Sequence, residues 1–328
     1  MEKKSKVKWS TKRKVIVILS SIIGVILLCI LGVVGYGYYV YSKMDTVQIN
    51  REEVLNEEGK KEESKHIINV ALFGVDRGEK DGGEDGMKGL SDSNIILTIN
   101  EDKKEIKVSS IMRDTYVTIP GYGDSIINQA MYEGGPELML KTINTNFDLD
   151  IDKFIGVNLN TLPQLIDKLG GLDFEVDSDE FKFINSYIDN INSKNNTNIA
   201  HLKSPGKQHL NGTQATAYCR IRYTEGTDFK RTERQRNVLT LIAKKLSAMS
   251  VGELNSFVLE ELPIVKTNLS YGEIVSIGKA ILNIGTGNIQ QNRFPNDGDH
   301  WSTGTFGDYK LNIDKQATTE KMHKFIYE

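Results

Sequence analysis

An uncharged apolar run near the start of the chain constrains its architecture more than any other feature. From Val15 to Gly35 there are 21 consecutive residues without a charge, and only Ser20 and Ser21 among them carry strongly polar side chains. A helix of this length crosses a bilayer core of roughly 30 Å. It also satisfies its own backbone hydrogen bonds where no water is present. The sequence therefore predicts a transmembrane helix over residues 15–37.

The charges before this run predict its orientation. Residues 1–14 contain seven Lys and Arg but one Glu, and such basic segments stay on the cytoplasmic side of a membrane. The alternative is a cleaved signal peptide, which has a shorter apolar core and a small-residue cleavage motif. No such motif stands between Gly32 and Met44. We expect an uncleaved single-pass anchor in the cell membrane, a cytoplasmic tail at 1–14 and an extracellular remainder.

The composition changes again after the anchor. Residues 38–66 are rich in charge and poor in apolar side chains, which is typical of a solvated stalk. Residues 67–250 then alternate between strand-like and helix-like patterns, and residues 251–328 continue this mixture without a clear linker. We therefore expect one α/β domain from residue 67 to the end of the chain.

Particular segments carry the strand and helix signals. Apolar runs of strand length stand at Ile67–Val75 and Asn94–Ile99, and Glu105–Ile111 alternates as a strand does. Pro136–Asn146 has a helical pattern with Pro in its first turn. Residues 185–200 are rich in Asn and Ser, and we expect them to form a surface excursion.

Charge and motifs exclude several classes of function. The formal net charge is −3, although the first fourteen residues are strongly basic. The acidic remainder would repel nucleic acid, so we expect no nucleic-acid partner. The sequence contains no G-x-S-x-G, H-E-x-x-H, C-x-x-C or Walker A motif. The five histidines show no metal-ligand spacing.

Two aspartates mark a candidate metal site. Asp76 ends the first predicted strand and Asp92 precedes the second. If these strands are antiparallel neighbours, both carboxylates lie at one edge of the sheet, and such hard oxygen ligands suit Mg²⁺ carried with substrate phosphates. The alternative is that both are ordinary turn or capping residues. Spacing alone favours this alternative.

A second group of residues suggests an anion site. Arg220 and Arg222 are two residues apart, so in an extended segment they point the same way. On a helix, Arg231 and Gln235 share a stripe with Val238 and the apolar residues beyond it. That stripe aims Arg231 toward the core, where an unpaired charge is costly. Its partner is either a structural carboxylate such as Asp228 or a ligand phosphate, and the clustering of arginines favours phosphate.

Together these segments resemble the LytR-CpsA-Psr family of cell-envelope proteins. The resemblance runs in order along the chain through nine short segments: Phe73–Asp76, Ser91-Asp92, Ser110–Val117, Ile127–Ala130, Gly134-Gly135, Leu169–Gly171, Leu210–Ala215, Tyr218–Arg222 and Asp228–Gln235. The resemblance implies an αβα sandwich with a central mixed β-sheet behind one N-terminal transmembrane helix. It also implies a Mg²⁺-dependent phosphotransferase, with Mn²⁺ as the alternative ion. Such an enzyme moves a glycopolymer, such as teichoic acid or capsule, from a polyprenyl-pyrophosphate carrier to peptidoglycan.

The resemblance also implies roles for individual residues. The family's metal-binding aspartates fall on Asp76 and Asp92. Its pyrophosphate-binding residues fall on the following five: Arg113, Arg220, Arg222, Arg231 and Gln235. Asp228 and Arg234 match as supporting residues. Arg113, Asp92 and Asp114 are the catalytic candidates, and the sequence does not decide whether Asp92 or Asp114 assists deprotonation of the acceptor.

Two positions depart from the family pattern. Leu90 stands where the family usually has Arg, and Met112 stands where it usually has Pro. Three other functions remain as alternatives. They are a polyprenyl-pyrophosphate hydrolase that uses the same site with water, a non-catalytic envelope scaffold, and a transcriptional attenuator. A cytoplasmic tail of fourteen residues is too short to contain a DNA-binding module.

Overall fold

The computed structural model describes most of the chain beyond its N-terminal segment. The described residues are Tyr36, Tyr39, Val40, 42–55, 67–76, 87, 89–158, 160–223, 227–305 and 308–328. The chain separates into two compact units, Met1–Met44 and Asp45–Glu328, and the second unit contains the elements below. The predicted transmembrane helix lies almost wholly outside the described residues. Among the described helices, none is both long enough and apolar enough to cross a bilayer.

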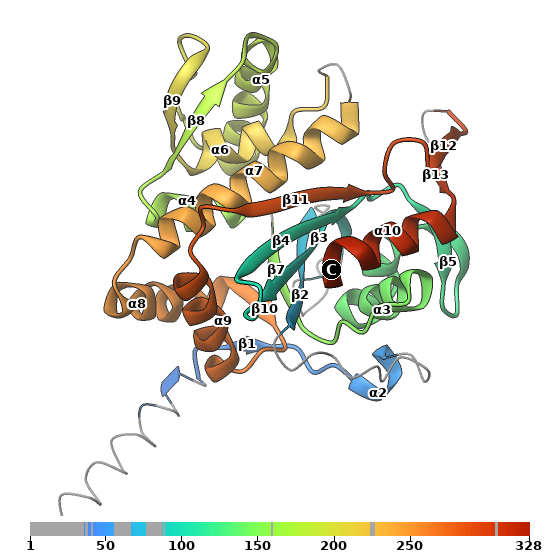
Figure 1. The fold of residues 1–328 in the computed structure, drawn as a ribbon. Coiled ribbons are helices and arrows are strands. Elements are labelled where there is room, and N and C mark those ends of the chain that lie inside the picture. Colours follow the sequence, from blue (N-terminus) through green and yellow to red (C-terminus); the bar gives the residue numbers. More distant parts are fainter. Residues whose placement is uncertain are drawn as a thin grey trace, which may run out of the picture. The chain divides into compact units, whose positions relative to one another are not determined.

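A seven-stranded sheet forms the centre of the second unit (Figure 1), in the order β1-β10-β7-β2-β3-β4-β11. The strand bounds are β1 (Asp45–Thr46), β2 (Ile67–Asp76), β3 (Leu90–Asn100), β4 (Glu105–Ile111), β7 (Phe154–Asn158), β10 (Val265–Thr267) and β11 (Ile289–Phe294). β3 is antiparallel to both β2 and β4, whereas β7 is parallel to β2 and β11 is parallel to β4. The sheet is therefore mixed, as expected.

Helices cover both faces of this sheet (Figure 1). α3 (Gln129–Phe147) and α10 (Lys315–Tyr327) lie on one face, where Met139 and Met322 share a buried core with Phe73. α9 (Tyr271–Ile284) lies on the other face, where Ile277 packs with Val70 and Ile99. Strand residues alternate between the two cores because successive side chains of a strand point to opposite faces. The three layers confirm the predicted αβα sandwich.

A second core lies beside the sheet and is built from one continuous stretch of chain. Its elements are α4 (Leu162–Lys168), β8 (Leu172–Val176), α5 (Ser178–Asn195), β9 (Gly206–Leu210), α6 (Gly212–Arg220) and α7 (Thr227–Ser247). Small elements complete the unit: α2 (Arg51–Val54), β5 (Tyr116–Ile119), β6 (Gly123–Ile126), α8 (Val251–Glu261), η1 (Leu262–Ile264), β12 (His300–Thr303) and β13 (Lys310–Ile313). β10 and β11 show that residues beyond 250 supply strands of the central sheet.

The prediction of a surface excursion at 185–200 was wrong for most of that segment. Residues up to Asn195 continue α5, whose Ile184, Ile188 and Ile191 are buried along one stripe. The helix begins with a capping box, in which the Asp177 and Glu180 side chains bond each other's backbone N–H groups. The polar composition of the exposed face concealed this apolar stripe.

The folded unit also begins earlier than the sequence suggested. Residues 45–54 were assigned to the stalk, but β1 pairs with β10, and Val54 of α2 is 1% exposed in the core beneath α3. α3 in turn starts at Gln129, before the predicted Pro136. Non-helical backbone at Gly134 and Gly135 interrupts it immediately before that proline, so Pro136 still stands at the start of a regular helical segment.

Candidate active site

Three strand ends meet at one edge of the sheet. β2 ends at Asp76, whose backbone pairs with Leu90 at the start of β3. β4 ends at Ile111, which pairs with Asn94, so Arg113 follows β4 next to Asp92. The antiparallel pairing of β2 with β3 confirms that the backbones of Asp76 and Asp92 lie at the same edge. The Asp76 side chain lies outside the described part of the chain, so its pairing with Asp92 around a metal remains a prediction.

Asp92 lies at the centre of a cluster of guanidinium groups. Arg113 Nη1 donates to Asp92 Oδ1 at 2.5 Å, and Arg222 Nη2 lies 3.4 Å from Oδ2. Arg231 Nη1 is 3.9 Å from Oδ1, and Gln235 Nε2 reaches the backbone oxygen of Asp92 at 3.5 Å. The structure thus brings together four of the five predicted pyrophosphate-binding residues.

The first turns of α7 supply the buried part of this cluster. Arg231 is only 2% exposed, and its Nη2 lies 2.9 Å from Asp228 Oδ1. Asp228 is also 3.5 Å from Arg113 Nη2, and Asp114 Oδ2 is 3.4 Å from Arg113 Nε. Arg231 points inward because it lies on the same helical stripe as the buried Val238. Asp228 is therefore a structural partner of Arg231, as one of the two predicted alternatives stated.

Several buried N–H groups of this cluster form no hydrogen bond with the described residues, although the Asp114 and Asp92 carboxylates lie 3.4 Å from Arg113 Nε and 3.9 Å from Arg231 Nη1. Nε and Nη1 of Arg231 and Nε of Arg113 are inaccessible to solvent and form no hydrogen bond within the described residues. A buried donor without an acceptor costs free energy, and the cost is larger for a charged group. Guanidinium groups match phosphate oxygens in geometry and charge. The unsatisfied donors therefore fit an anionic ligand of the phosphate class.

The same surroundings shift the pKa values of Asp92 and Asp114 in opposite directions. Burial favours the neutral form of Asp92, but the charges of Arg231, Arg113 and Arg222 outweigh burial and hold the pKa of Asp92 below its usual value. For Asp114, burial outweighs the charge of Arg113 and raises the pKa. Asp92 is thus a permanent anion at neutral pH, whereas Asp114 is the better proton acceptor of the two.

The arginines themselves remain charged. Burial lowers the pKa of Arg231, but only to about 10. Burial also opposes the charge on Arg113, yet the carboxylates of Asp228, Asp92 and Asp114 raise its pKa. Among the described side chains, the three positive charges of Arg113, Arg222 and Arg231 equal the three negative charges of their aspartate partners, which are Asp92, Asp114 and Asp228. A bound diphosphate would add negative charge that these described side chains do not offset.

Arg234 holds the segment that carries Arg222. It is 3% exposed; its Nε donates to Glu180 Oε1 at 2.8 Å and its Nη1 donates to the backbone oxygen of Ile221 at 3.1 Å. The Tyr187 hydroxyl accepts from the backbone N–H of Arg222 at 3.1 Å. Sequence reasoning missed Glu180 and Tyr187. The spacing Asp177-x-x-Glu180 is a capping-box signal, and it would have indicated α5.

Arg220 occupies a different position from the one predicted. It is the last residue of α6, and the backbone becomes extended only at Ile221. Arg220 lines a hollow between α5 and α6, with Lys194 and Thr216 among its neighbours. Arg220 and Arg222 therefore do not extend from one straight strand, because a helix end separates them.

The two departures from the family pattern have structural consequences. The Met112 backbone N–H donates to the oxygen of Phe294 at 3.0 Å, a bond that Pro could not form, and its Sδ accepts from the Thr232 hydroxyl at 3.4 Å. Met112 thus ties β11 and α7 to the site. Leu90 is 37% exposed at the start of β3. Its apolar side chain offers no hydrogen bond to an anion.

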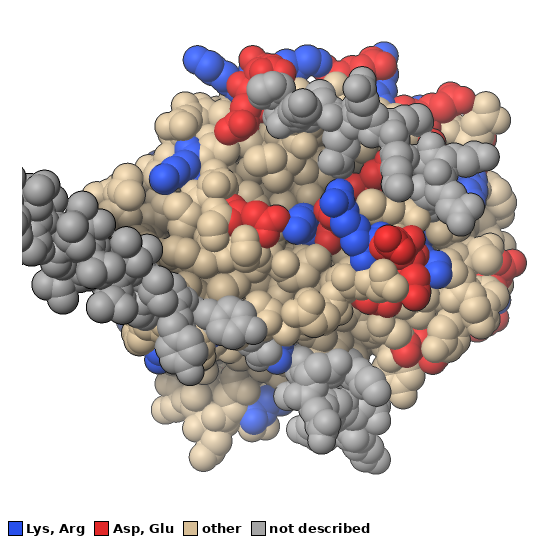
Figure 2. Space-filling model, turned by 90° about the horizontal axis from the view of Figure 1, so that it is seen from below, with Lys and Arg blue, Asp and Glu red and all other residues tan. Residues whose placement is uncertain are grey.

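The concentration of arginines at this edge has no counterpart in the described part of the face seen in Figure 2. Figure 2 shows another face of the molecule, on which basic side chains lie next to acidic ones and form no continuous basic patch among the described residues. The described residues also contain no group of three or more His, Cys, Asp or Glu arranged to hold a metal. A metal at this edge would therefore need oxygen ligands from the substrate or from Asp76 in addition to Asp92.

Comparisons with known sequences agree with the geometry. A sequence model of the LytR_cpsA_psr family matches residues 36–324. A relative from Bacillus cereus, named polyisoprenyl-teichoic acid–peptidoglycan teichoic acid transferase TagU, is 30% identical over 323 residues, covering 94% of this chain and 97% of the relative. A relative of the same name from Enterococcus faecalis is 30% identical over 266 residues, covering 79% and 82% of the two chains.

Solved structures share the fold. Bacillus subtilis TagT superposes with a TM-score of 0.63 at 23% identity, covering 85% of this chain and 99% of TagT. A structure described as the LytR-CPS2A-psr family protein YwtF (TagT) with bound octaprenyl pyrophosphate lipid has a TM-score of 0.62 at 22% identity, with coverage of 85% and 99%.

Proposed function

Because this chain belongs to the LytR-CpsA-Psr family, we propose that it is a transferase that moves a glycopolymer from a polyprenyl-pyrophosphate carrier to peptidoglycan. The glycopolymer is of the teichoic acid or capsule class. Two relatives are named as teichoic acid transferases of this kind, and a protein of the same fold was solved with a polyprenyl pyrophosphate. The observation that carries the proposal is the set of buried, unsatisfied guanidinium N–H groups of Arg231 and Arg113.

In this proposal the arginines bind and orient the pyrophosphate of the donor. Arg113, Arg222 and Arg231 surround the anion and neutralise the charge that develops on the departing polyprenyl phosphate. The acceptor hydroxyl oxygen attacks the phosphorus that carries the glycan, and the bond from that phosphorus to the bridging oxygen breaks. The polyprenyl phosphate leaves with the electron pair. The hydroxyl proton passes to a carboxylate, and Asp114 suits this role better than Asp92 because its pKa is raised.

We propose that Mg²⁺ accompanies the donor, with Asp76 and Asp92 as the protein ligands. Hard carboxylate oxygens are the ligands that Mg²⁺ prefers, usually together with substrate phosphates. Among the described side chains, three arginines and three aspartates balance at the site, and Asp76 would add a fourth carboxylate. A divalent cation would offset much of the negative charge that Asp76 and a bound diphosphate add, and it would supply charge stabilisation during transfer.

The N-terminal segment completes the proposal. An anchor at 15–37 with a basic tail at 1–14 would hold the catalytic unit on the outer side of the cell membrane. A lipid-linked donor resides in that membrane, so the anchor would keep enzyme and donor in the same plane.

The proposal is tested with the full chain purified in detergent, a labelled lipid-linked donor and peptidoglycan oligomers. We expect label on the oligomers with Mg²⁺ and little with chelator. Arg113→Gln should lower the rate by roughly 10²–10³-fold, as loss of one transition-state donor typically does. Arg51→Gln is the matched control, because Arg51 on α2 is 69% exposed and its ion pair with Asp152, at 2.6 Å, does not involve the arginine cluster.

Three outcomes would contradict the proposal. Release of free glycan with none on the oligomers would favour a hydrolase. Equal rates for Arg113→Gln and wild type would remove the arginine cluster from the reaction. A reporter fused after residue 328 that is active only in the cytoplasm would reverse the proposed orientation.

A further inference from the structure

Two hairpins join into a small sheet beside the candidate active site. β12 pairs with β13, β5 pairs with β6, and Thr115 pairs in parallel with Leu311, so that β13 lies next to β5 (Figure 1). The strand order is therefore β12-β13-β5-β6, and we call this unit the hairpin sheet. Thr115 and Leu311 are buried, so the face that carries them is the inner face.

The outer face of the hairpin sheet carries the large ring of Trp301. The register places Trp301 opposite Asn312 and Thr303 opposite Lys310, and these four side chains share the outer face. Trp301 is 56% exposed, and it is the only tryptophan between Asp45 and the end of the chain. A single exposed apolar residue needs no explanation. Here, however, the ring lies among an amide, a hydroxyl and an ammonium group on one surface.

This combination of groups suits a chain of sugar rings. The C–H groups of a pyranose ring form an apolar face that stacks on an indole, whereas its hydroxyl and acetamido groups need hydrogen-bond partners. Asn312 Nδ2 donates to Thr303 Oγ1 at 2.8 Å, and the amide oxygen of Asn312 is a further acceptor. Lys310 Nζ lies 4.9 Å from the centre of the Tyr116 ring and 3.5 Å from Asp308 Oδ1. Its ammonium group is thus held over the outer face, where it can meet a carboxylate of a ligand.

The hairpin sheet is continuous with the candidate active site. The Leu311 N–H donates to the backbone oxygen of Asp114 at 2.9 Å. Tyr116 on the outer face follows Asp114 by two residues, which span at most about 7 Å. At the start of β12, the His300 ring is 5.2 Å from the ring of Phe229 in the first turn of α7. A ligand on the outer face can therefore extend to Asp114, the proposed proton acceptor.

The outer face is also fixed in place and of suitable length. The Asp314 N–H donates to the backbone oxygen of Asp299 at 2.8 Å, and Lys321 Nζ lies 2.6 Å from both carboxylate oxygens of Asp299. These contacts hold the base of β12 and β13, and a preorganised surface binds with little loss of conformational freedom. Trp301 and Tyr116 are two strand spacings apart, about 10 Å, which is close to the length of a disaccharide.

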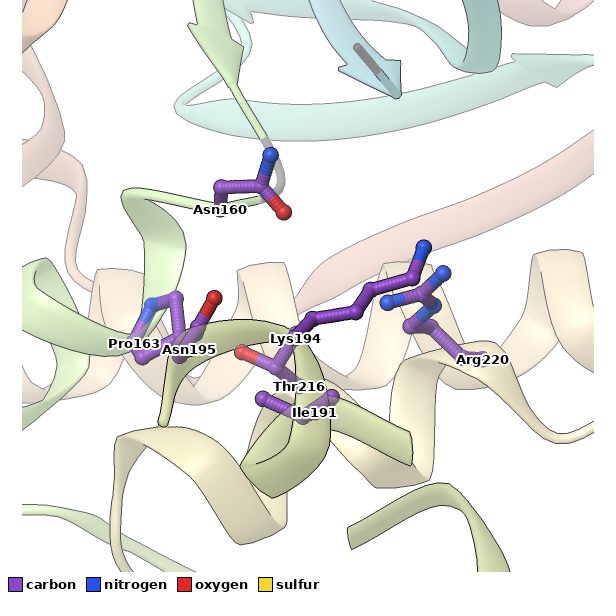
Figure 3. A pocket seen from close by; sticks show the side chains of 7 residues that line it. All are labelled: Asn160, Pro163, Ile191, Lys194, Asn195, Thr216 and Arg220. Carbon is purple, nitrogen blue, oxygen red and sulfur yellow. The ribbon is translucent and has the colours of Figure 1, made fainter. Parts of the chain in front are cut away.

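Other places and other occupants fit less well. The hollow between α5 and α6 (Figure 3) is too narrow for even a water molecule, so a polymer cannot enter it. A lipid surface is a poorer occupant of the outer face, because the chain enters the folded unit at β1 whereas β12 follows β11. β1 and β11 are the two ends of the central sheet, and six strand spacings, about 30 Å, separate them.

We propose that the outer face of the hairpin sheet binds the glycan strand of the peptidoglycan acceptor and brings one of its hydroxyl groups toward Asp114. Trp301 stacks on a sugar ring, and Asn312 and Thr303 bond hydroxyl or acetamido groups. Lys310 pairs with a carboxylate of the strand. This inference rests on the proposed function, because it takes peptidoglycan as the acceptor.

The test uses the full chain in detergent micelles with the substitution Trp9→Phe, so that Trp301 is the only indole that fluoresces. Titration with soluble strands of alternating N-acetylglucosamine and N-acetylmuramic acid should change this fluorescence and reach saturation. In calorimetry, Trp301→Ala should weaken binding of the strands about tenfold, as loss of an aromatic anchor does. Trp301→Phe should recover part of the affinity, because a flat ring remains, and Lys310→Gln should weaken binding as well. Lys279→Gln is the matched control, because Lys279 is exposed on α9.

The results separate this inference from the proposed function. None of these variants should change the affinity for inorganic pyrophosphate. Equal affinity for the strands in wild type and Trp301→Ala would overturn the inference, even if glycopolymer transfer occurs as proposed. Trp301 fluorescence that is quenched by vesicles of brominated phospholipid, but not changed by the strands, would overturn it in favour of a membrane contact. A chain that binds the strands through Trp301 but transfers no glycopolymer would instead contradict the proposed function and leave the outer face as a cell-wall contact.

Discussion

The paired substitutions Asp92→Asn and Asp114→Asn test the electrostatics of the arginine cluster. Both replace a carboxylate by an amide of the same shape, and both carboxylates lie near Arg113. We expect Asp92→Asn to lower the free energy of unfolding at pH 7. We expect Asp114→Asn to leave it unchanged or to raise it.

The magnitude follows from the contacts of Asp92. Its carboxylate, 12% exposed, accepts one short bond from Arg113 at 2.5 Å and lies 3.9 Å from Arg231. A hydrogen bond to a charged group contributes about 1.5–3 kcal/mol. At an effective dielectric constant of about 20, two charges at the Arg231 distance attract by about 4 kcal/mol. Burial of Asp92 offsets part of this attraction, and Asn retains one acceptor. We therefore expect a loss of about 2–3 kcal/mol.

The dependence on pH has a definite sign. The folded pKa of Asp92 lies below its ordinary value of 3.8. Its charge therefore stabilises the fold fully above the unfolded pKa, and this contribution disappears as the pH falls through the folded value. The pKa of Asp114 is raised instead, so ionisation of Asp114 weakens the fold above its folded pKa.

Urea unfolding followed by circular dichroism at pH 7 and at several values below pH 4 measures these differences. The difference in free energy of unfolding between wild type and Asp92→Asn should become smaller as the pH falls below 4. An equal decrease in the free energy of unfolding for both variants at pH 7 would refute the reasoning. It would mean that the arginines stabilise the carboxylates of Asp92 and Asp114 to the same extent. If the difference in free energy of unfolding between wild type and Asp92→Asn became larger in acid, the lowered pKa of Asp92 would be refuted.

Three further predictions concern the supports of the site. Glu180→Gln removes the buried carboxylate that Arg234 contacts at 2.8 Å. We expect the free energy of unfolding in urea to fall by about 3–5 kcal/mol. A decrease below 1 kcal/mol would contradict the pairing of Glu180 with Arg234. Gly212→Ala places a Cβ 1.9 Å from the backbone oxygen of Pro163. We therefore expect thermal unfolding to show a free energy of unfolding lower by about 1–3 kcal/mol. An unchanged unfolding midpoint would show that α4 and α6 separate easily. The pKa of Asp114 is raised, and an anion bound nearby should raise that pKa further. Pyrophosphate affinity should therefore increase from pH 7 to pH 5 more in wild type than in Asp114→Asn. Identical pH profiles of the affinity in calorimetry would exclude Asp114 as the group that takes up the proton.

Local patterns were sufficient for the central elements. The apolar runs of β2 and β3 and the alternation in β4 predicted three strands, because a strand buried on both faces is apolar throughout and a strand buried on one face alternates. That these strands are neighbours was left as a condition. The stripe through Arg231 and Val238 predicted that a cation points inward on α7, since helical periodicity fixes which residues share a face.

Partners distant in sequence could not be predicted in this way. Arg234 contacts Glu180, 54 residues earlier, and Asp92 contacts Arg222 across 130 residues. No periodicity specifies such pairs, because they depend on how separate elements pack. The same limit explains why Arg220 was placed in an extended segment, although it closes α6.

The sequence by itself determined the strands β2, β3 and β4 that end at the site, and which arginine on α7 turns inward, because both depend on spacing along the chain. Only the tertiary structure decided that Asp92 is surrounded by three guanidinium groups while Asp114 is left with a raised pKa. The physical reason is that a pKa depends on burial and on distances between charges, and both are fixed only when β3, β4 and α7 meet at one edge of the sheet.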